Sequence, residues 1–289
     1  MRIVFEKTSY TYMENTPLEK RALHEVSTTF PSGEIIAVIG RTGSGKSTLV
    51  QHINGLLRPS QGKVTIGERT VDPKTKKKQI QKLRENVGMV FQYPEHQLFE
   101  ETVEKDIIFG PLNAGTSEQQ IKKQVPMLIQ RVGLDESLLH QSPFHLSGGQ
   151  MRRAAIAGVL AMNPQVLILD EPTASLDPKG KQEIIELLKE WHEEKRLTII
   201  IVTHDMEEVA DIASRAVVMH DGRIAMEGHA QEIFEQQGRL EALGLDLPPR
   251  LKVLSYISVK TGVPFSSWSL SPEKAATEVN ASRKGNKDV

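Results

Sequence analysis

The sequence predicts an α/β fold in which a mostly parallel sheet carries helices between its strands. Short, almost wholly apolar runs of the kind found in strands buried on both faces occur at residues 34–39, 87–91, 166–169 and 198–202. Between the last two runs, the spacing of Ile184, Leu188 and Trp191 indicates a helix with one buried face. A strand, a helix and a strand in succession indicate a parallel pair joined by a right-handed crossover.

Other segments flank or interrupt this core. The first 30 residues alternate in polarity and turn near Pro17, as expected for N-terminal antiparallel strands. From about residue 94 to 160 helical patterns replace strand patterns, which indicates an inserted α-helical subdomain. Within it, Pro126 is expected to divide the helical pattern at 121–132. Beyond Gly244, a proline-containing hinge precedes a small C-terminal helical extension.

Composition restricts the class of protein. The 289 residues carry a net charge of -1, from 36 basic and 37 acidic residues, so a nucleic-acid partner is not expected. The absence of cysteine excludes disulfides and cysteine-bound zinc. The polar N-terminus does not resemble a signal peptide, and apolar stretches are far shorter than the roughly 20 residues of a membrane-spanning helix. We therefore expect a water-soluble cytoplasmic protein that reaches a membrane only through a partner.

A phosphate-binding loop follows the strand predicted at 34–39. It fits the pattern G-x-x-x-x-G-K-[ST] with Gly40, Arg41, Thr42, Gly43, Ser44, Gly45, Lys46 and Ser47, and Thr48 comes next. Glycines let main-chain N–H groups turn toward phosphates, and the following helix presents its positive end. Lys46 is expected to reach the β- and γ-phosphates of ATP, and the Ser47 hydroxyl to bind Mg²⁺. The core is therefore predicted to be that of a P-loop NTPase, with a RecA-like arrangement.

An acidic pair ends another buried strand. Residues 166–169 lead directly into Asp170 and Glu171. Asp170 is expected to hold Mg²⁺, directly or through water, and Glu171 to polarise the attacking water as general base. An acidic turn after a strand is common in isolation, but its pairing with the phosphate loop favours the catalytic interpretation.

A second anion-binding element opens a helix about twenty residues before Asp170. Ser147 is expected to cap this helix, which begins with Gly148, Gly149 and Gln150. Free N–H groups at such a terminus attract anions. The element has no lysine and cannot hold a triphosphate alone. We therefore expect it to close over the γ-phosphate of ATP bound by another subunit.

Four further positions complete a set that resembles the ABC ATPase family across about residues 3–245. They are Gln92 after the strand at 87–91, Asp177 just past Glu171, His204 after the strand at 198–202, and Tyr12 upstream of the phosphate loop. The resemblance implies that Gln92 links the Mg²⁺ site to the helical subdomain and senses the γ-phosphate. It implies that His204 contacts the γ-phosphate and that Asp177 belongs to a loop crossing a dimer interface.

The same resemblance implies that Tyr12 stacks on adenine, with Tyr10 as the alternative. Glu171, His204 and Gln92 are then the catalytic residues. Ser175 departs from the family pattern, because glycine is often found at this position. The change is small, and little effect is expected from it.

Two stretches are similar, more narrowly, to the ATPases of energy-coupling factor (ECF) transporters, relatives of the cobalt-import ATPases. One runs over residues 91–111, and the other, 151–162, looks most like the second of the paired ECF ATPases. This resemblance implies a second ABC ATPase (a paralogue or this chain itself), a transmembrane coupling protein and a membrane substrate-capture subunit. The coupling protein would dock near residues 92–99, and the chain would lie peripherally on the cytoplasmic face of the cell membrane.

The family pattern also divides the chain into domains. Residues 1–245 form an ABC ATPase domain, with the helical subdomain at about 94–160. The family implies that residues 246–271 form a C-terminal dimerisation extension. The polar, charge-mixed composition of residues 272–289 predicts a disordered tail. The implied function is ATP hydrolysis that energises uptake of a vitamin or transition-metal micronutrient, which the capture subunit selects.

Alternatives are the ATPase of another ABC importer class and a soluble, non-transport ABC ATPase. The soluble class usually has long coiled-coil insertions or two fused cassettes, and neither pattern occurs here. A P-loop kinase or GTPase would leave Ser147 and His204 unexplained.

Overall fold

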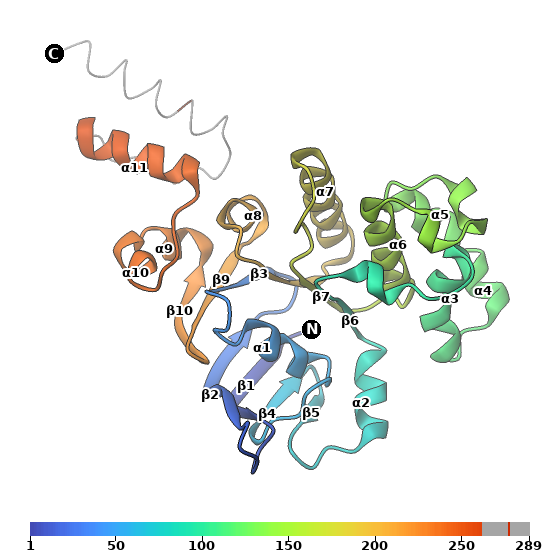
Figure 1. Ribbon diagram of the computed structural model, residues 1–289, viewed down its shortest axis with the longest axis horizontal. Coiled ribbons are helices and arrows are strands. Elements are labelled where there is room, and N and C mark those ends of the chain that lie inside the picture. The colour runs from blue at the N-terminus through green and yellow to red at the C-terminus, as the bar shows by residue number, and fades with distance from the viewer. Residues whose placement is uncertain (262–276, 278–289) are drawn as a thin grey trace.

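Two sheets and a block of helices make up the part of the protein that the computed structural model describes, residues 1–261 and 277 (Figure 1). Within that part, one sheet has the strand order β2-β1-β4-β5 and the other the order β10-β9-β3-β8-β7-β6. The predicted α/β fold with N-terminal antiparallel strands is thus confirmed. The tail predicted at 272–289 and the end of the predicted extension, 262–271, lie outside the described residues except for Thr277.

The first sheet is antiparallel and packs one face on the core. Its strands are β1 (Ile3–Tyr12), β2 (Lys20–Phe30), β4 (Gln61–Ile66) and β5 (Arg69–Val71). β1 pairs with both β2 and β4, so that Ile3 lies opposite Phe30 on one side and Ile66 on the other. Alternate side chains of these strands are buried, which explains the alternating polarity seen in the sequence.

The second sheet is parallel except for its edge strand β10. Its strands are β3 (Ile35–Ile39), β6 (Val87–Val90), β7 (Val166–Asp170), β8 (Thr198–Val202), β9 (Arg215–His220) and β10 (Arg223–His229). Every residue of β3, β6, β7 and β8 is buried, as their apolar runs predicted. Since β8 lies between β3 and β7, and β6 lies beyond β7, the carboxyl ends of four strands meet at one edge.

Helices cover both faces of this sheet, as Figure 1 shows. They are α1 (Lys46–Ile53), α2 (Lys77–Arg84), α7 (Pro178–Lys195), α8 (Met206–Ile212), α9 (Ala230–Phe234), α10 (Gln237–Ala242) and α11 (Pro249–Thr261). α1 contributes Leu49 and Ile53 to the core shared by the two sheets. α7 buries the predicted face, including Leu188 and Trp191, against the other side of the parallel sheet.

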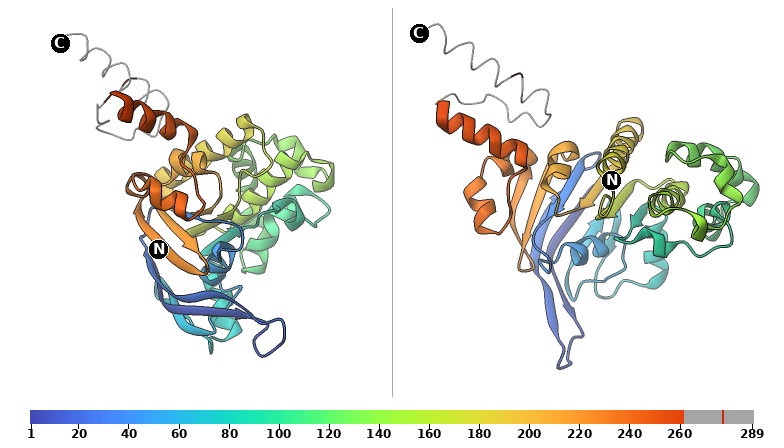
Figure 2. Two further views of the ribbon diagram at one scale, coloured as in Figure 1. Left: turned by 60° about the vertical axis from the view of Figure 1, so that its left-hand side comes forward. Right: turned by 45° about the horizontal axis from the view of Figure 1, so that its top comes forward.

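The inserted helical block projects to one side of the sheets (Figures 1 and 2). It comprises η1 (Pro94–Gln97), α3 (Val103–Asn113), α4 (Glu118–Lys122), α5 (Val125–Arg131), η2 (Glu136–His140), η3 (Pro143–His145) and α6 (Gly148–Ala161). Pro126 occupies the first turn of α5, where its missing N–H costs least, so the predicted division into two helices occurs. α6 joins the block to the sheet through one continuous apolar core.

The C-terminal segment packs on the far end of the parallel sheet. Leu247, Leu251 and Leu254 are buried among side chains of α8, α9 and β9. Arg250 reinforces this packing by binding Glu207 at 3.2 Å and Asp211 at 2.7 Å, both on α8. Across the described part of the chain, the helices are too short or too polar to cross a membrane.

The buried face of α7 provides a test of this packing. Leu188→Ala removes a fully buried side chain from the core, and we expect a loss of about 2–5 kcal/mol in the free energy of unfolding. Glu190→Ala, two positions along on the exposed face, is the matched control and should change it by about 0.5 kcal/mol or less. Denaturant unfolding of the two variants measures the difference, and equal losses would contradict the assigned orientation of α7.

Candidate active site

The phosphate loop joins the carboxyl end of β3 to α1. Gly45, the residue before α1, has φ +102°, and a Cβ there would lie 2.8 Å from the carbonyl oxygen of Ala22. Only glycine fits this position. No side chain caps α1, and its first turn contains no acidic residue. The N–H groups at this helix start are therefore directed to the site, where they can bind a phosphate.

Lys46, the first residue of α1, is held inside the loop. Its Nζ donates to the carbonyl oxygens of Gly40, at 2.8 Å, and Arg41, at 3.2 Å. Partial burial lowers the pKa of this ammonium, and the nearby Glu171 and Asp170 carboxylates oppose the shift. The arrangement places one cation between the loop and the acidic pair that the sequence predicted.

Asp170, at the end of β7, is mostly buried and lies within hydrogen-bond reach of the Ser47 hydroxyl. Burial raises the pKa of its carboxyl, while the hydrogen bond from Ser47 and the charge of Lys46 act in the opposite direction. Hydroxyl and carboxylate oxygens are hard donors that suit Mg²⁺. Gln92, which follows β6, lines the same pocket and offers an amide oxygen.

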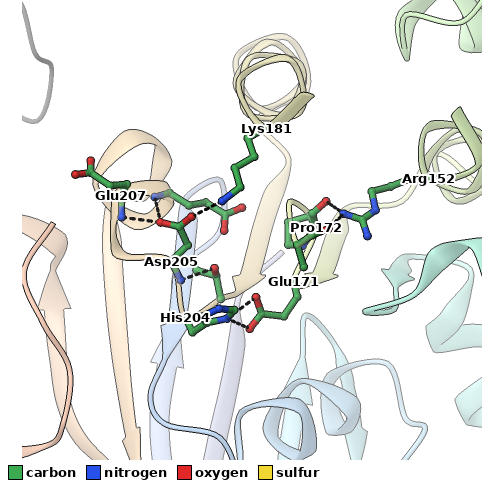
Figure 3. Close-up of polar contacts among 10 residues, drawn as sticks. Arg152, Glu171, Pro172, Lys181, His204, Asp205 and Glu207 are labelled. Carbon is green, nitrogen blue, oxygen red and sulfur yellow. Dashed lines mark hydrogen bonds and ion pairs between the residues drawn. The ribbon is translucent and has the colours of Figure 1, made fainter. Parts of the chain in front are cut away.

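Glu171 and His204 come from the ends of two neighbouring strands and point at each other (Figure 3). Nδ1 of His204 lies 2.8 and 2.9 Å from the two carboxylate oxygens of Glu171. Because an ionised carboxylate can only accept, the imidazole Nδ1–H is then the donor. Glu171 has φ +54°, a conformation that directs its side chain toward the site from the end of β7.

An aromatic wall closes the other end of the pocket. The Tyr12 ring meets Tyr10 edge to face at 4.8 Å, and Tyr10 meets the buried ring of His52 at 5.0 Å. The Tyr12 hydroxyl lies 3.1 Å from Oγ1 of Thr48 on α1. Of the two tyrosines, Tyr12 is the more exposed and is the one that lines the pocket.

One pocket of about 710 Å³ brings most of the predicted residues together. Its lining includes Tyr12, Thr42, Gly43, Gly45, Lys46, Ser47, Thr48, Gln92, Asp170 and Glu171. Gly40, Arg41, Ser44 and His204 adjoin it without lining it. The remaining wall comes from the β1–β2 turn, the start of β2 and the turn between β9 and β10; its residues are Met13, Leu18, Lys20, Arg21, Ala22, His24, Asp221 and Gly222.

The second anion-binding element lies elsewhere, at the start of α6. Ser147 caps this helix by accepting from Gln150 N at 3.3 Å, and the Gln150 side chain accepts from Ser147 N at 2.8 Å. None of residues 147–150 lines the pocket formed by residues 40–48. Gly148 and Gly149 leave the helix start uncovered, since a Cβ at Gly148 would meet nothing within 4 Å.

Sequence analysis missed two buried charged residues beside the site, Arg152 and Glu208. The Arg152 guanidinium donates to the carbonyl oxygens of Pro172, at 2.9 Å, and Ala174, at 2.6 Å. The Glu208 carboxyl, on α8, faces the hydroxyls of Thr203 and Thr173. Both residues follow a recognised motif by a few positions, but a sequence does not reveal that an Arg or Glu on an amphipathic helix points inward.

Burial raises the pKa of Glu208 to about 7, since its side chain is only 3% exposed. The Asp205 and Glu171 carboxylates raise it further, and the Thr203 and Thr173 hydroxyls partly oppose the shift. The neighbouring cation is Lys181 of α7, whose Nζ binds Asp205 at 2.8 Å (Figure 3). A carboxyl in this setting holds its proton up to about neutral pH.

Comparison with known proteins decides the family. The ABC transporter family matches residues 23–174. The energy-coupling factor transporter ATP-binding protein EcfA2 of Bacillus thuringiensis (strain Al Hakam) is 53% identical over 279 residues, which cover 96% of this chain and 95% of that protein. EcfA2 of Geobacillus kaustophilus (strain HTA426) is 50% identical, with 96% of each chain covered.

The chain is a member of the energy-coupling factor transporter ATP-binding proteins. Solved structures of ABC ATPases share the fold. CbiO1 from Clostridium perfringens, described as part of the ABC transporter complex cbiONQ, superposes with a TM-score of 0.73 at 40% identity, covering 88% of this chain and 98% of that one. The dimeric ATP-binding cassette MJ0796 bound to ADP and Pi gives 0.72 at 28% identity, with 79% and 98% covered. Like other ABC ATPases, this ECF ATPase binds and hydrolyses ATP.

The pKa of Glu208 predicts how the stability of this ECF ATPase depends on pH. Between its ordinary value of 4.5 and about 7 the folded state keeps the proton that the unfolded state has lost. The free energy of unfolding should therefore fall as pH rises through that window and level off above it. Glu208→Gln has no such proton, so the variant should lose less stability than the native protein between pH 5 and pH 8.

Melting temperatures at the two pH values measure this difference, with Glu190→Gln as the control for an exposed carboxyl. Identical losses for the native protein and Glu208→Gln would show that the carboxyl does not hold its proton in the folded state.

Proposed function

We propose that this chain is one of two ATPases that close on MgATP and thereby drive an ECF-type importer. The separation of residues 147–150 from the pocket formed by residues 40–48 carries this proposal. An anion-binding helix start that does not serve its own pocket fits closure over the γ-phosphate held by a second ATPase, with Asp177 near that interface. The solved dimer of MJ0796 supports such a pair.

Different residues of the pocket would bind the phosphates, the adenine and the Mg²⁺ ion of MgATP. Lys46 and the N–H groups at the start of α1 bind the phosphates, and Tyr12 stacks on adenine with its ring held by Tyr10. Ser47, Asp170 and Gln92 would hold Mg²⁺, which when bound would neutralise negative charge on the phosphates. The oxygen donors of these three side chains fit that ion.

Glu171 is the proposed general base. Its carboxylate takes a proton from the water that attacks the γ-phosphorus, the bond to the β-phosphate oxygen breaks, and ADP and phosphate result. His204 orients the carboxylate through Nδ1, and its Nε2 would contact the γ-phosphate. In the described structure this histidine and glutamate are already paired.

A groove on the helical block is the proposed docking site for the transmembrane coupling protein. It has a volume of about 280 Å³ and is lined by apolar residues that include Leu98, Phe99, Phe109 and Val159. Phe99 and Phe109, 58% and 42% exposed, contact each other edge to face at 4.8 Å. Exposed aromatic pairs of this kind are typical of interaction sites.

The remaining partners and the cargo follow from the family. CbiO1 is part of a complex named cbiONQ, which supports a transmembrane assembly for this chain as well. We propose a membrane substrate-capture subunit that selects a vitamin or transition-metal micronutrient. The chain itself would lie at the cytoplasmic face of the membrane, with residues 246–261 helping to hold the ATPase pair together.

The role of Glu171 has a direct test. Glu171→Gln keeps the size of the side chain and one acceptor oxygen but cannot act as a base, so turnover should fall on the order of a hundredfold or more. Nucleotide binding should persist, and the closed pair should accumulate with ATP. Phosphate release measures turnover, and gel filtration measures pairing. Undiminished turnover in Glu171→Gln, alongside a normal Glu190→Gln control, would remove Glu171 from this role.

The membrane partner is tested by purification from solubilised membranes. A tagged chain should recover an integral-membrane protein together with a second ATPase. Phe99→Asp and Phe109→Asp place a charge in the apolar groove and should abolish recovery of the membrane protein while the ATPase activity of the chain persists. Met127→Asp, at an exposed position of α5 outside the groove, is the control. Recovery without any integral-membrane protein would favour a soluble ABC ATPase instead.

A further inference from the structure

The turn that follows the proposed general base is held in an unfavourable conformation. Glu171 has φ +54° and Ser175, four residues later, has φ +64°. Left-handed backbone is costly for residues other than glycine and persists only where the surroundings determine it. Contacts from outside the turn must therefore stabilise these two residues.

Arg152 supplies such contacts from α6. One nitrogen of its guanidinium, Nη1, donates to the main-chain oxygens of both Pro172 and Ala174, which lie between the two left-handed residues. Figure 3 shows the side chain reaching across from the helix to Pro172. Arg152 is 5% exposed, and charge-assisted hydrogen bonds in a buried setting are stronger than those in water.

The opposite side of the turn faces α8. Thr173, only 2% exposed, faces the buried carboxyl of Glu208. The same carboxyl faces Thr203, the residue before His204. Main-chain oxygens of the turn thus accept hydrogen bonds from Arg152 of α6. The side chain of Thr173, at the centre of the turn, faces Glu208 of α8, the helix that follows His204.

α6 is also the helix that Ser147 caps and that joins the helical block to the sheet. Ala154, Ile156 and Ala157 of α6 are buried in one core with Val103 and Ile107 of α3. Arg152 lies on the first turns of this helix, between the capping serine and that core. A change in the orientation of the helical block therefore reaches residues 172–174 through the Arg152 hydrogen bonds.

We propose that Arg152 is a positioning residue that sets the carboxylate of Glu171 according to the orientation of α6. The proposal rests on the proposed role of Glu171 as general base. ATP hydrolysis in one chain would then respond to what binds at the start of α6 in the same chain. The reason is that Ser147, which caps α6, and Arg152 belong to one rigid element. Arg152 does not line the pocket and acts through the turn.

The test compares Arg152→Met and Arg152→Lys with Arg153→Met. Methionine keeps an unbranched side chain but donates nothing, and lysine keeps one charged donor. Arg153 is the matched control on the same helix, since it binds Glu183 and the carbonyl oxygen of Val132 and does not contact the turn. Each protein is assayed as the wild-type assembly is, with its second ATPase present.

Arg152→Met should lower kcat on the order of a hundredfold, the effect of displacing a catalytic group by about 1 Å. The Kd for a fluorescent ATP analogue should not change, because the phosphate loop is untouched. Arg152→Lys should recover part of kcat. Arg153→Met should lower the melting temperature but leave kcat close to the wild-type value. This separation of kcat from Kd, with rescue by lysine, distinguishes positioning from a general loss of stability.

Wild-type kcat in Arg152→Met, or an equal loss in Arg152→Met and Arg153→Met, would overturn the proposal. If Arg152→Met does not fold, Arg152→Lys against Arg153→Lys decides it: a greater loss of kcat at position 152 supports positioning, and equal values refute it. Glu171→Gln, measured in parallel, reports separately on the proposed function. If Glu171→Gln still turns over ATP, the proposed role of Glu171 is wrong. If Glu171→Gln is inactive but Arg152→Met is fully active, only the proposed role of Arg152 is wrong.

Discussion

The parallel pairing of β3, β8, β7 and β6 is the constraint on which the rest of the molecule depends. Parallel strands place their carboxyl ends at one edge, so four loops distant in sequence converge there. The phosphate loop follows β3, His204 follows β8, Asp170 and Glu171 end β7, and Gln92 follows β6. A shift of one residue in any of these pairings would exchange the two faces of a strand that is packed on both, and would move the side chains of the site apart.

Much of this arrangement could be predicted because the signals are local. A strand buried on both faces reads as an apolar run, and a phosphate loop needs glycine and lysine at set spacing. The strands at 35–39, 166–170 and 198–202 and the division at Pro126 therefore match the prediction closely. α2, which begins at Lys77 inside a lysine-rich stretch, and the short strands β4 and β5 were not predicted, because their stability comes from packing rather than from a strong local pattern.

In the proposed site too, residues in local motifs were predicted and residues placed by packing were not. Residues 40–48, Asp170 and Glu171 were predicted from motifs, and the pocket brings them together. Arg152 and Glu208 were not, since each sits on a helix where a charged residue ordinarily faces solvent. Only the fold shows that both point inward, toward the turn at 172–174. Burial of an unpaired charge is costly, and neither residue is left in that state: Arg152 donates to two main-chain oxygens, and Glu208 holds its proton up to about neutral pH.

The uncapped start of α1 has one more consequence. Its first N–H groups have neither a capping side chain nor an acidic neighbour, so an anion that accepts from them stabilises this helix turn. Binding and local ordering are then thermodynamically linked: whatever phosphate-bearing molecule occupies the loop also slows the amide hydrogen exchange of α1 and of Thr48. Because Thr48 lies against the Tyr12 hydroxyl, this slowing extends to the strand that carries the aromatic wall. A bound phosphate thus supplies the hydrogen-bond acceptors that the side chains of this helix start do not provide.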